Sequence, residues 1–193
     1  MAITDSRIPS AEIVEKQLQK SKRRRLIFQR AIVTIGVLAT VAAAAVIIAV
    51  LFLQVFKIEG RSMAETLQEG DLVVVEGISG FQKGDVVACY YGNDVLVKRI
   101  IATAGDTVEI DEEGNVTVNG ESLEEPYVRD KTIGNCNIEF PCTVPEGSNF
   151  VLGDCRSVSI DSRSSAIGCI EDRNIIGRVI FRIWPIGSAG KVK

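Results

Sequence analysis

The sequence predicts a mainly β protein in which a single N-terminal transmembrane helix precedes an all-β external domain. Two observations support this fold class. Residues 31–53 form an apolar run of 23 residues without a charge, whereas the later chain consists of short Val- and Ile-rich segments that end at Gly, Asp or Asn. Such segments are typical of strands, and no segment after Gly70 keeps a helical period over ten residues. The length of 193 residues suits one domain with an anchor.

The apolar run at residues 31–53, AIVTIGVLATVAAAAVIIAVLFL, is long enough to cross a membrane. As a helix with a rise of about 1.5 Å per residue it would extend roughly 34 Å, against a hydrocarbon core of about 30 Å. The main alternative is a cleavable signal peptide, whose apolar region spans only about 7–15 residues after a short leader. Here the run is longer and thirty residues precede it. We therefore expect an uncleaved anchor in the lipid bilayer.

Charge is distributed unequally on the two sides of this run. Residues 1–30 contain eight Lys or Arg and three Asp or Glu, and the basic cluster KSKRRR at Lys20–Arg25 lies just before the run. Residues 54–193 contain 14 basic and 22 acidic residues. Because basic flanking segments stay in the cytoplasm, we expect residues 1–30 to be a cytoplasmic tail, with SAEIVEKQLQKSKRRRLIFQR as a helix or a disordered extension, and residues 54–193 to lie outside the cell membrane. An acidic external domain gives no support for nucleic-acid binding.

Seven segments of the external domain are expected to be strands, because each is short, rich in β-branched residues and bounded by turn residues. Two of them form a hairpin around Glu113–Asn115. Residues 121–147 hold three of the five prolines and are expected to be an irregular insertion. Together the strands predict one sandwich-like or barrel-like unit. The segments are DLVVVEGIS, DVVACYY, VLVKRIIA, DTVEID, NVTVNG, NFVLG and GRVIFRIW.

The chain has five cysteines and no histidine, which restricts its chemistry. Cys136 and Cys142 lie close together in GNCNIEFPC and are the candidate pair for a disulfide in an oxidising compartment, although the sequence does not fix the pairing. No CxxC pair and no histidine accompany them. We therefore expect neither a metal site nor an organic cofactor.

Ser62, in the segment KIEGRSMAETL, is the candidate nucleophile. The lack of histidine excludes a Ser-His-Asp triad, so the proton of a reacting serine must go to a carboxylate, a terminal amine or a lysine. A lysine can accept it only when neutral, and an apolar site lowers the lysine pKa from about 10.4. In VLVKRIIA a period of two places Leu96, Lys98 and Ile100 on one strand face. Lys98 is therefore the candidate base, and a solvent-facing lysine remains the alternative.

A third polar segment, GDCRSVSIDSR at Gly153–Arg163, follows the predicted strand NFVLG and should lie at the end of a sheet. Its plainest interpretation is a solvated turn held by Asp and Ser side chains. Its functional interpretation is a supporting loop, in which hydroxyls orient a neutral lysine amine and an Asp–Arg pair fixes the backbone.

Taken in order, these segments resemble the bacterial type I signal peptidases, membrane-bound Ser-Lys proteases that remove signal peptides from exported preproteins after small residues. The resemblance covers most of residues 54–187. It implies that Ser62 is the nucleophile, that Lys98 is the general base, and that no cofactor takes part. The substrate of this family lies as an extended strand against sheet edges. The resembling segments are SMAETL, DLVVV, KGDVV, VKRIIATAGDTV, GDCRSVSIDSR and IIGRVIFRIWP.

The same resemblance implies roles for residues around the dyad. The backbone N–H of Ser62 would contribute to an oxyanion hole, and Gly60 stands where some relatives add a hydroxyl to it. Ser159 would hydrogen-bond the lysine amine, with Asp161 and Arg163 supporting the loop.

Three departures from the family pattern are visible. Glu65 stands where relatives have proline, Cys155 stands where they have asparagine, and the run SSAIG after the supporting loop is about two residues longer than the commonest spacing. These departures keep open a different function, that of a non-catalytic, membrane-tethered β module that binds extended peptides. A self-cleaving repressor with the same dyad is a further alternative, but thirty N-terminal residues are too few for a DNA-binding domain.

Overall fold

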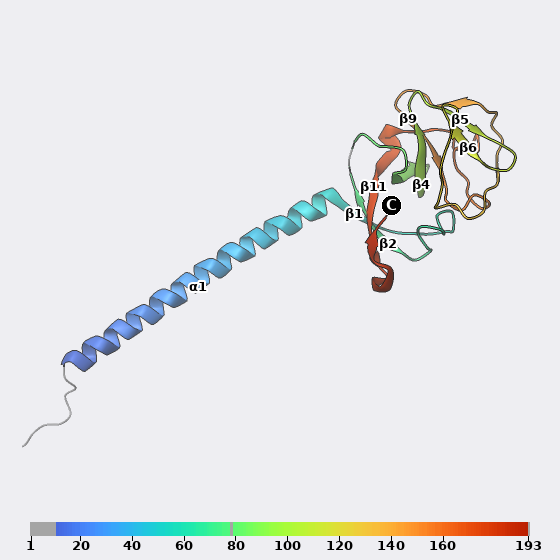
Figure 1. Ribbon diagram of the computed structural model, residues 1–193. Helices are drawn as coiled ribbons and strands as arrows, with labels where there is room; N and C mark the ends of the chain where they lie inside the picture. Colours follow the sequence, from blue (N-terminus) through green and yellow to red (C-terminus); the bar gives the residue numbers. More distant parts are fainter. Residues whose placement is uncertain (1–10, 78, 193) are drawn as a thin grey trace, which may run out of the picture. The chain divides into compact units, whose positions relative to one another are not determined.

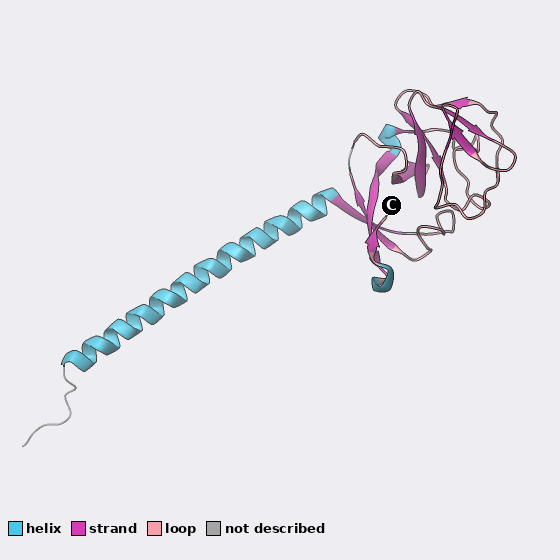
Figure 2. Ribbon diagram, in the orientation of Figure 1, coloured by secondary structure: helices cyan, strands magenta, loops and turns pink. Residues whose placement is uncertain are grey.

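The computed structural model describes residues 11–77 and 79–192, and the chain divides into two compact units between Val50 and Leu51 (Figure 1). Helix α1, Ala11–Phe52, accounts for the described part of the first unit and ends just inside the second. The second unit is built of strands, as Figure 2 shows. The mainly β class with one N-terminal apolar helix is therefore confirmed.

Helix α1 begins twenty residues before the predicted span at residues 31–53. The reason lies in the sequence of residues 11–30, which is rich in Glu, Lys, Gln, Leu and Arg and contains neither Gly nor Pro. The stretch Val14–Ile47 has a mean hydropathy of 2.1 over its most apolar window, and none of that window is buried by protein. By length and composition it could cross a membrane. Leu53, the last residue of the predicted span, belongs to the first strand.

The predicted strands are present, together with five short strands that the sequence did not indicate. All seven predicted segments contain a strand, and β5 and β6 form the expected hairpin, with Ile110 opposite Val116. The strands are β1 Leu53–Lys57, β2 Leu72–Glu76, β3 Val86–Tyr91, β4 Asp94–Thr103, β5 Thr107–Ile110, β6 Val116–Val118, β7 Glu121–Ser122, β8 Cys142–Thr143, β9 Ser148–Leu152, β10 Ile170–Glu171, β11 Ile175–Trp184 and β12 Gly190–Lys191. Two short 3-10 helices, η1 Asp172–Asn174 and η2 Ile186–Ser188, flank β11.

These strands form two sheets within the described residues. The larger has the order β1-β2-β11-β3-β4-β9-β10, with β12 added to β11, and the smaller has the order β7-β6-β5-β8. Neighbouring strands of the larger sheet run antiparallel. Strand β4 is central, because β3 pairs with one of its edges and β9 with the other.

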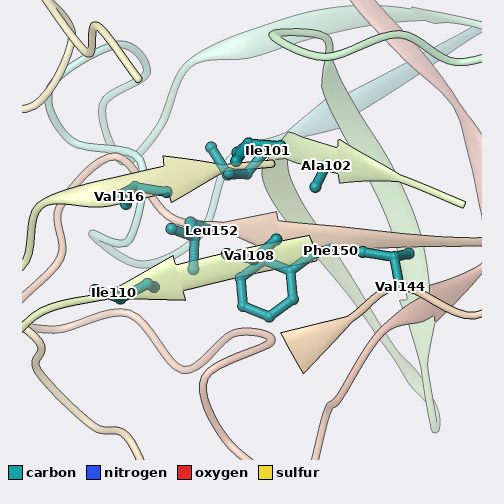
Figure 3. Close-up of a cluster of buried hydrophobic side chains, with 9 residues drawn as sticks. Ile101, Ala102, Val108, Ile110, Val116, Val144, Phe150 and Leu152 are labelled. Atoms are coloured by element: carbon teal, nitrogen blue, oxygen red, sulfur yellow. The ribbon is translucent and has the colours of Figure 1, made fainter. Parts of the chain in front are cut away.

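The two sheets are joined by a common apolar core. Figure 3 shows one of its clusters, in which Ile101 and Ala102 of β4 and Phe150 of β9 meet Val108 of β5 and Val116 of β6. Each of these side chains is at most 1% exposed. Burial of this kind contributes about 25 cal/mol per Å² of apolar surface. Strand β4 is therefore held in place by hydrogen bonds at both edges and by packing against the second sheet.

Candidate active site

Ser62 lies in a turn between β1 and β2. Gly60 has a φ of +81°, a conformation that favours glycine, and it lets the chain leave the direction of β1. The turn is closed by hydrogen bonds from Ala64 N to Arg61 O, at 3.1 Å, and from Leu67 N to Met63 O, at 2.6 Å. Met63 and Leu67 are buried and hold the turn on the core, whereas Ser62 itself stays partly exposed.

Lys98 lies on the central strand β4 and is only 3% exposed. Its neighbours two residues away, Leu96 and Ile100, contact one apolar cluster, as the period of two predicted. Within the described residues its amine forms no ion pair. Burial lowers the pKa of Lys98 below its ordinary value of 10.5, and attraction by Asp161 offsets this lowering only in part. The interpretation of Lys98 as a solvent-facing lysine was therefore wrong.

The supporting loop Gly153–Arg163 is fixed largely by Asp161 and Arg163. The Asp161 carboxylate accepts hydrogen bonds from Gly153 N, at 3.0 Å, and from Arg163 Nε, at 2.8 Å. Burial by itself would raise the pKa of Asp161, but its bonds to Arg163 and Gly153 outweigh burial and lower it. Arg163 is completely buried and also donates to the carbonyl oxygens of Ile133 and Arg156. The predicted solvated turn is thus a loop whose charged side chains are buried, while Ser157, Val158 and Ile160 stay exposed.

The supporting loop and the Ser62 turn meet at Gly153. A Cβ atom at this position would lie 2.6 Å from the carbonyl oxygen of Ser62 and 2.6 Å from Cβ of Ser159, too close for either contact. The same Ser62 oxygen accepts a hydrogen bond from Cys155 N, at 3.0 Å. Gly153 therefore allows the two segments to pack directly on each other, and no larger residue would fit without a shift of the backbone.

Ser159 is completely buried, and its Oγ makes no hydrogen bond of full geometry among the described residues, although it lies close enough to the Asp161 carboxylate to help lower the pKa of that group. Buried hydroxyls are nearly always hydrogen-bonded, so an unpartnered one calls for an explanation. It lies beside Gly153, between the Ser62 turn and Asp161, the carboxylate whose attraction acts on Lys98. The structure thus brings the predicted residues into one region of the molecule.

An open cavity of about 340 Å³ adjoins Ser62. It lies between the end of β1 with the turn that follows, Phe56–Met63, and the first half of β4, Asp94–Val97. Phe56, Leu96 and Val97 provide apolar surface beside Ser62, and Lys98 directly follows Val97 on the strand. The backbone N–H of Ser62 makes no hydrogen bond within the described residues. An extended peptide could enter this cavity with a carbonyl oxygen facing that free N–H group.

Two buried arginines, Arg99 and Arg156, were given no role by the sequence. Arg99 pairs with Asp154 at 2.7 Å, and its guanidinium lies 3.9 Å from the centre of the Tyr127 ring. Arg156 pairs with Glu125, and both side chains are almost fully buried. Asp154 and Arg156 lie inside the motif GDCRS, which could have indicated them. Nothing in the sequence marked Glu125 or Tyr127, because both lie in the irregular segment at residues 121–147.

The two positions that depart from the resembled family pattern, Glu65 and Cys155, each make a contact in the structure. Glu65 forms an ion pair with Arg129 at 2.7 Å, which ties the Ser62 turn to the irregular segment. Cys155 supplies its backbone N–H to Ser62 O, a bond that any residue except proline could make at this position. Gly60 shapes the turn, and its missing side chain leaves open space. No group of three or more Cys, Asp or Glu side chains among residues 11–77 and 79–192 has the arrangement of a metal site.

Comparison with known proteins identifies close relatives. The family model described as "Signal peptidase, peptidase S26" matches residues 29–184. The chain is 36% identical to signal peptidase IB of Staphylococcus aureus over 154 residues, which is 69% of this chain and 78% of that protein. It is 31% identical to signal peptidase I U of Bacillus subtilis over 179 residues, 86% of this chain and 95% of that one.

Among solved structures, a signal peptidase I from Enterococcus faecalis is 30% identical. It covers 53% of this chain and 98% of its own, with a TM-score of 0.43.

Proposed function

This chain belongs to the signal peptidase family, peptidase S26, and we propose that a Ser62–Lys98 dyad performs its reaction while helix α1 anchors it in the membrane. The family is one of serine endopeptidases that remove signal peptides, and this chain is such an enzyme. The observation that best supports the dyad is the burial of Lys98, which forms no ion pair with any described residue and lies on the strand that borders the Ser62 cavity.

In the proposed reaction Lys98 acts as the base. Its neutral amine takes the proton of Ser62 Oγ, which attacks the carbonyl carbon before the cleaved bond. The oxygen of the tetrahedral intermediate accepts a hydrogen bond from the Ser62 N–H group, which has no other acceptor within the described residues. The Lys98 ammonium then returns the proton to the leaving amine, and water releases the acyl group in a second cycle of the same transfers.

Ser159, Asp161 and Arg163 act through Lys98 in this proposal. The unpartnered Ser159 hydroxyl is available to hold the neutral amine, and the negative charge of Asp161 stabilises the ammonium that forms during the reaction. Arg163 keeps Asp161 ionised and in place. The three are positioning residues rather than catalytic ones.

The membrane topology is also part of the proposal. Residues 1–30 would lie in the cytoplasm, residues 31–53 in the bilayer and residues 54–193 outside, because the basic cluster Lys20–Arg25 precedes the apolar run. Ser62 lies nine positions after Leu53, a distance of at most about 30 Å when the chain is extended. A signal peptide is itself held in the membrane, so a shared surface layer raises the effective concentration of enzyme and preprotein.

Cleavage of a preprotein by the full-length enzyme in detergent tests the dyad. The preprotein carries an Ala-x-Ala site, and the products are identified by mass. We expect cleavage after the second alanine, with a loss of at least about 10³-fold in kcat/KM for Ser62→Ala and for Lys98→Ala. The matched controls are Ser157→Ala, an exposed serine, and Lys83→Ala, a lysine whose side chain is 43% exposed.

Two results would contradict the dyad. One is full activity of either dyad variant. The other is binding of the preprotein without cleavage, under conditions in which a Staphylococcus signal peptidase cuts it. That second result would favour a tethered module that binds extended peptides.

A further inference from the structure

Thr66 lies four residues after Ser62, and the reaction proposed above assigns no task to it. Its backbone N–H donates to Met63 O at 2.8 Å, so it belongs to the turn that carries the nucleophile. Its half-buried hydroxyl has two charged partners. Thr66 Oγ1 donates to the Asp154 carboxylate and accepts a hydrogen bond from Arg99 Nη2 at 3.2 Å. One side chain of the turn therefore contacts both members of a buried ion pair.

The two partners of Thr66 lie on the other two segments of the site. Arg99 directly follows Lys98 on β4. Asp154 directly follows Gly153, the residue at which the supporting loop packs on the turn. Arg99 holds Asp154 through two bonds, from Nε at 2.9 Å and from Nη2 at 2.7 Å. The turn, the strand of the proposed base and the supporting loop thus meet at the Thr66 hydroxyl.

The ion pair is a fixed point for the turn. The Arg99 guanidinium also donates from Nη1 to Gly84 O at 2.9 Å, and it lies 3.9 Å from the centre of the Tyr127 ring. Both charged side chains of the pair are at most 2% exposed. Loss of the Thr66 hydroxyl would therefore release the turn and leave the Arg99–Asp154 pair in place.

Hydrogen bonds, rather than covalent links, hold the three segments together. All five cysteines are free thiols, so the disulfide expected between Cys136 and Cys142 is not formed within residues 11–77 and 79–192. The backbone bond from Cys155 N to Ser62 O, at 3.0 Å, joins the turn to the loop near the nucleophile. The bonds of Thr66 join a charged partner on each side, and such bonds are stronger than those between neutral groups.

We propose that Thr66 is a positioning residue for the reaction. By bonding the turn to the buried ion pair, its hydroxyl fixes where Ser62 lies relative to Lys98. This role rests on the proposed dyad. Proton transfer needs its donor and acceptor within hydrogen-bond reach, and a displacement of about 1 Å can lower a rate roughly 100-fold. Valine has a shape similar to that of threonine but no hydroxyl, so Thr66→Val removes both bonds to the ion pair.

Kinetics of the full-length variants in detergent, with the Ala-x-Ala preprotein, test this role. We expect Thr66→Val to lower kcat roughly 10- to 100-fold and to leave KM nearly unchanged, because Thr66 lies outside the residues that line the cavity. Thr66→Ser keeps the hydroxyl and should restore most of kcat. The matched control is Thr103→Val, which removes a threonine bond to Asp106, at 3.1 Å, at the far end of β4 and should leave kcat unchanged.

Hydrogen exchange, followed by mass spectrometry, gives a readout that does not depend on proteolysis. The amides of Thr66 and Leu67 both donate to Met63 O within the turn. In Thr66→Val they should exchange roughly 10-fold faster, because the turn opens more often without its bonds to charged groups. Thr66→Ser should exchange like the unaltered enzyme. Unchanged exchange along β4 would show that the slow variant is folded.

Several results would overturn the positioning role. These are full kcat in Thr66→Val, unchanged exchange of its turn, equal losses of kcat in Thr66→Ser and Thr66→Val, or an equal loss in Thr103→Val. Failure of the dyad is distinguishable from failure of this role. An active Ser62→Ala would overturn both, whereas an inactive Ser62→Ala beside a fully active Thr66→Val would overturn the positioning role alone.

Discussion

A lysine amine can accept a proton only while it is neutral, so the surroundings of Lys98 should set the pH dependence of the enzyme. Burial lowers the pKa of Lys98, and the favourable charge of Asp161 raises it again in part. We therefore expect kcat/KM to rise with pH as Lys98 loses its proton, with a midpoint below 10.5. A pH profile with a short Ala-x-Ala peptide would measure this midpoint, and a rising limb centred at 10.5 or above would contradict the role of Lys98.

Ser159 offers a test in which activity and stability should respond differently. Within residues 11–77 and 79–192 its buried hydroxyl makes no hydrogen bond of full geometry, and burying such a group costs about 1–3 kcal/mol. Ser159→Ala should therefore leave the free energy of unfolding unchanged or increase it. If the hydroxyl holds the neutral Lys98 amine, kcat should fall roughly 2- to 10-fold, because a hydrogen bond between neutral groups contributes about 0.5–1.5 kcal/mol.

The comparison needs kinetics and urea unfolding of the same samples. Ser157→Ala, in the same loop but exposed, is the control and should change neither quantity. Equal losses of activity and stability in Ser159→Ala would indicate that the residue serves the fold alone.

For single residues, the sequence predicted which strand face a side chain lies on but not whether that face is buried. The period of two put Lys98 on an apolar face but left its exposure open, because neighbours along one strand do not show what covers that face. The structure resolves this: β4 is buried on both faces from Lys98 to Ala102, and Arg99 on the opposite face is only 2% exposed. Arg99 is covered by Asp154 and Tyr127, which come from distant parts of the chain.

Among the elements, strands were easier to predict than the ends of the helix and the irregular segment. Val- and Ile-rich runs bounded by Gly or Asp depend on local sequence, so segments such as DVVACYY appear as strands where expected. Helix α1 extends back to Ala11 because helix-forming residues precede the apolar run, and hydropathy does not report them. The segment at residues 121–147 is held by ion pairs with other parts of the chain, which no local pattern indicates.

Two ion pairs link this irregular segment to the active-site region, and they should differ in strength. Glu125 and Arg156 are almost fully buried, so Glu125→Ala leaves an unpaired buried charge and should cost about 3–5 kcal/mol of unfolding free energy. The Arg129 side chain of the second pair is 81% exposed. Glu65→Ala should therefore cost less than about 1 kcal/mol.

Urea unfolding of the two variants beside the unaltered enzyme would measure both costs. A double variant, Glu125→Ala with Arg156→Met, should recover much of the loss because the unpaired charge is gone. Equal costs for Glu65→Ala and Glu125→Ala would show that burial does not decide the strength of these links.

For the molecule as a whole, the proposed anchoring depends on the apolar part of α1. Val41 lies within the predicted span, and its side chain is exposed along the helix. A lysine near the centre of a membrane helix costs about 2.5–3.5 kcal/mol. We therefore expect Val41→Lys to reduce the fraction of the protein that resists alkaline extraction from membranes, whereas Val41→Leu should not. Unchanged extraction of Val41→Lys would argue against a spanning role for this segment.

The positions of the proposed base and nucleophile in the fold have a consequence for inactivation by heat. Lys98 lies on a strand bonded at both edges, so its backbone amide should exchange hydrogen with solvent only when the whole domain unfolds. Ser62 lies in a turn closed by short-range bonds and held to the supporting loop by one backbone hydrogen bond, from Cys155 N to Ser62 O, and such a segment opens at a smaller cost in free energy than a strand bonded along both edges. On warming, the enzyme should lose the geometry of its nucleophile first. Activity would then disappear below the melting temperature and return on cooling, while the sheet that carries the lysine stays intact.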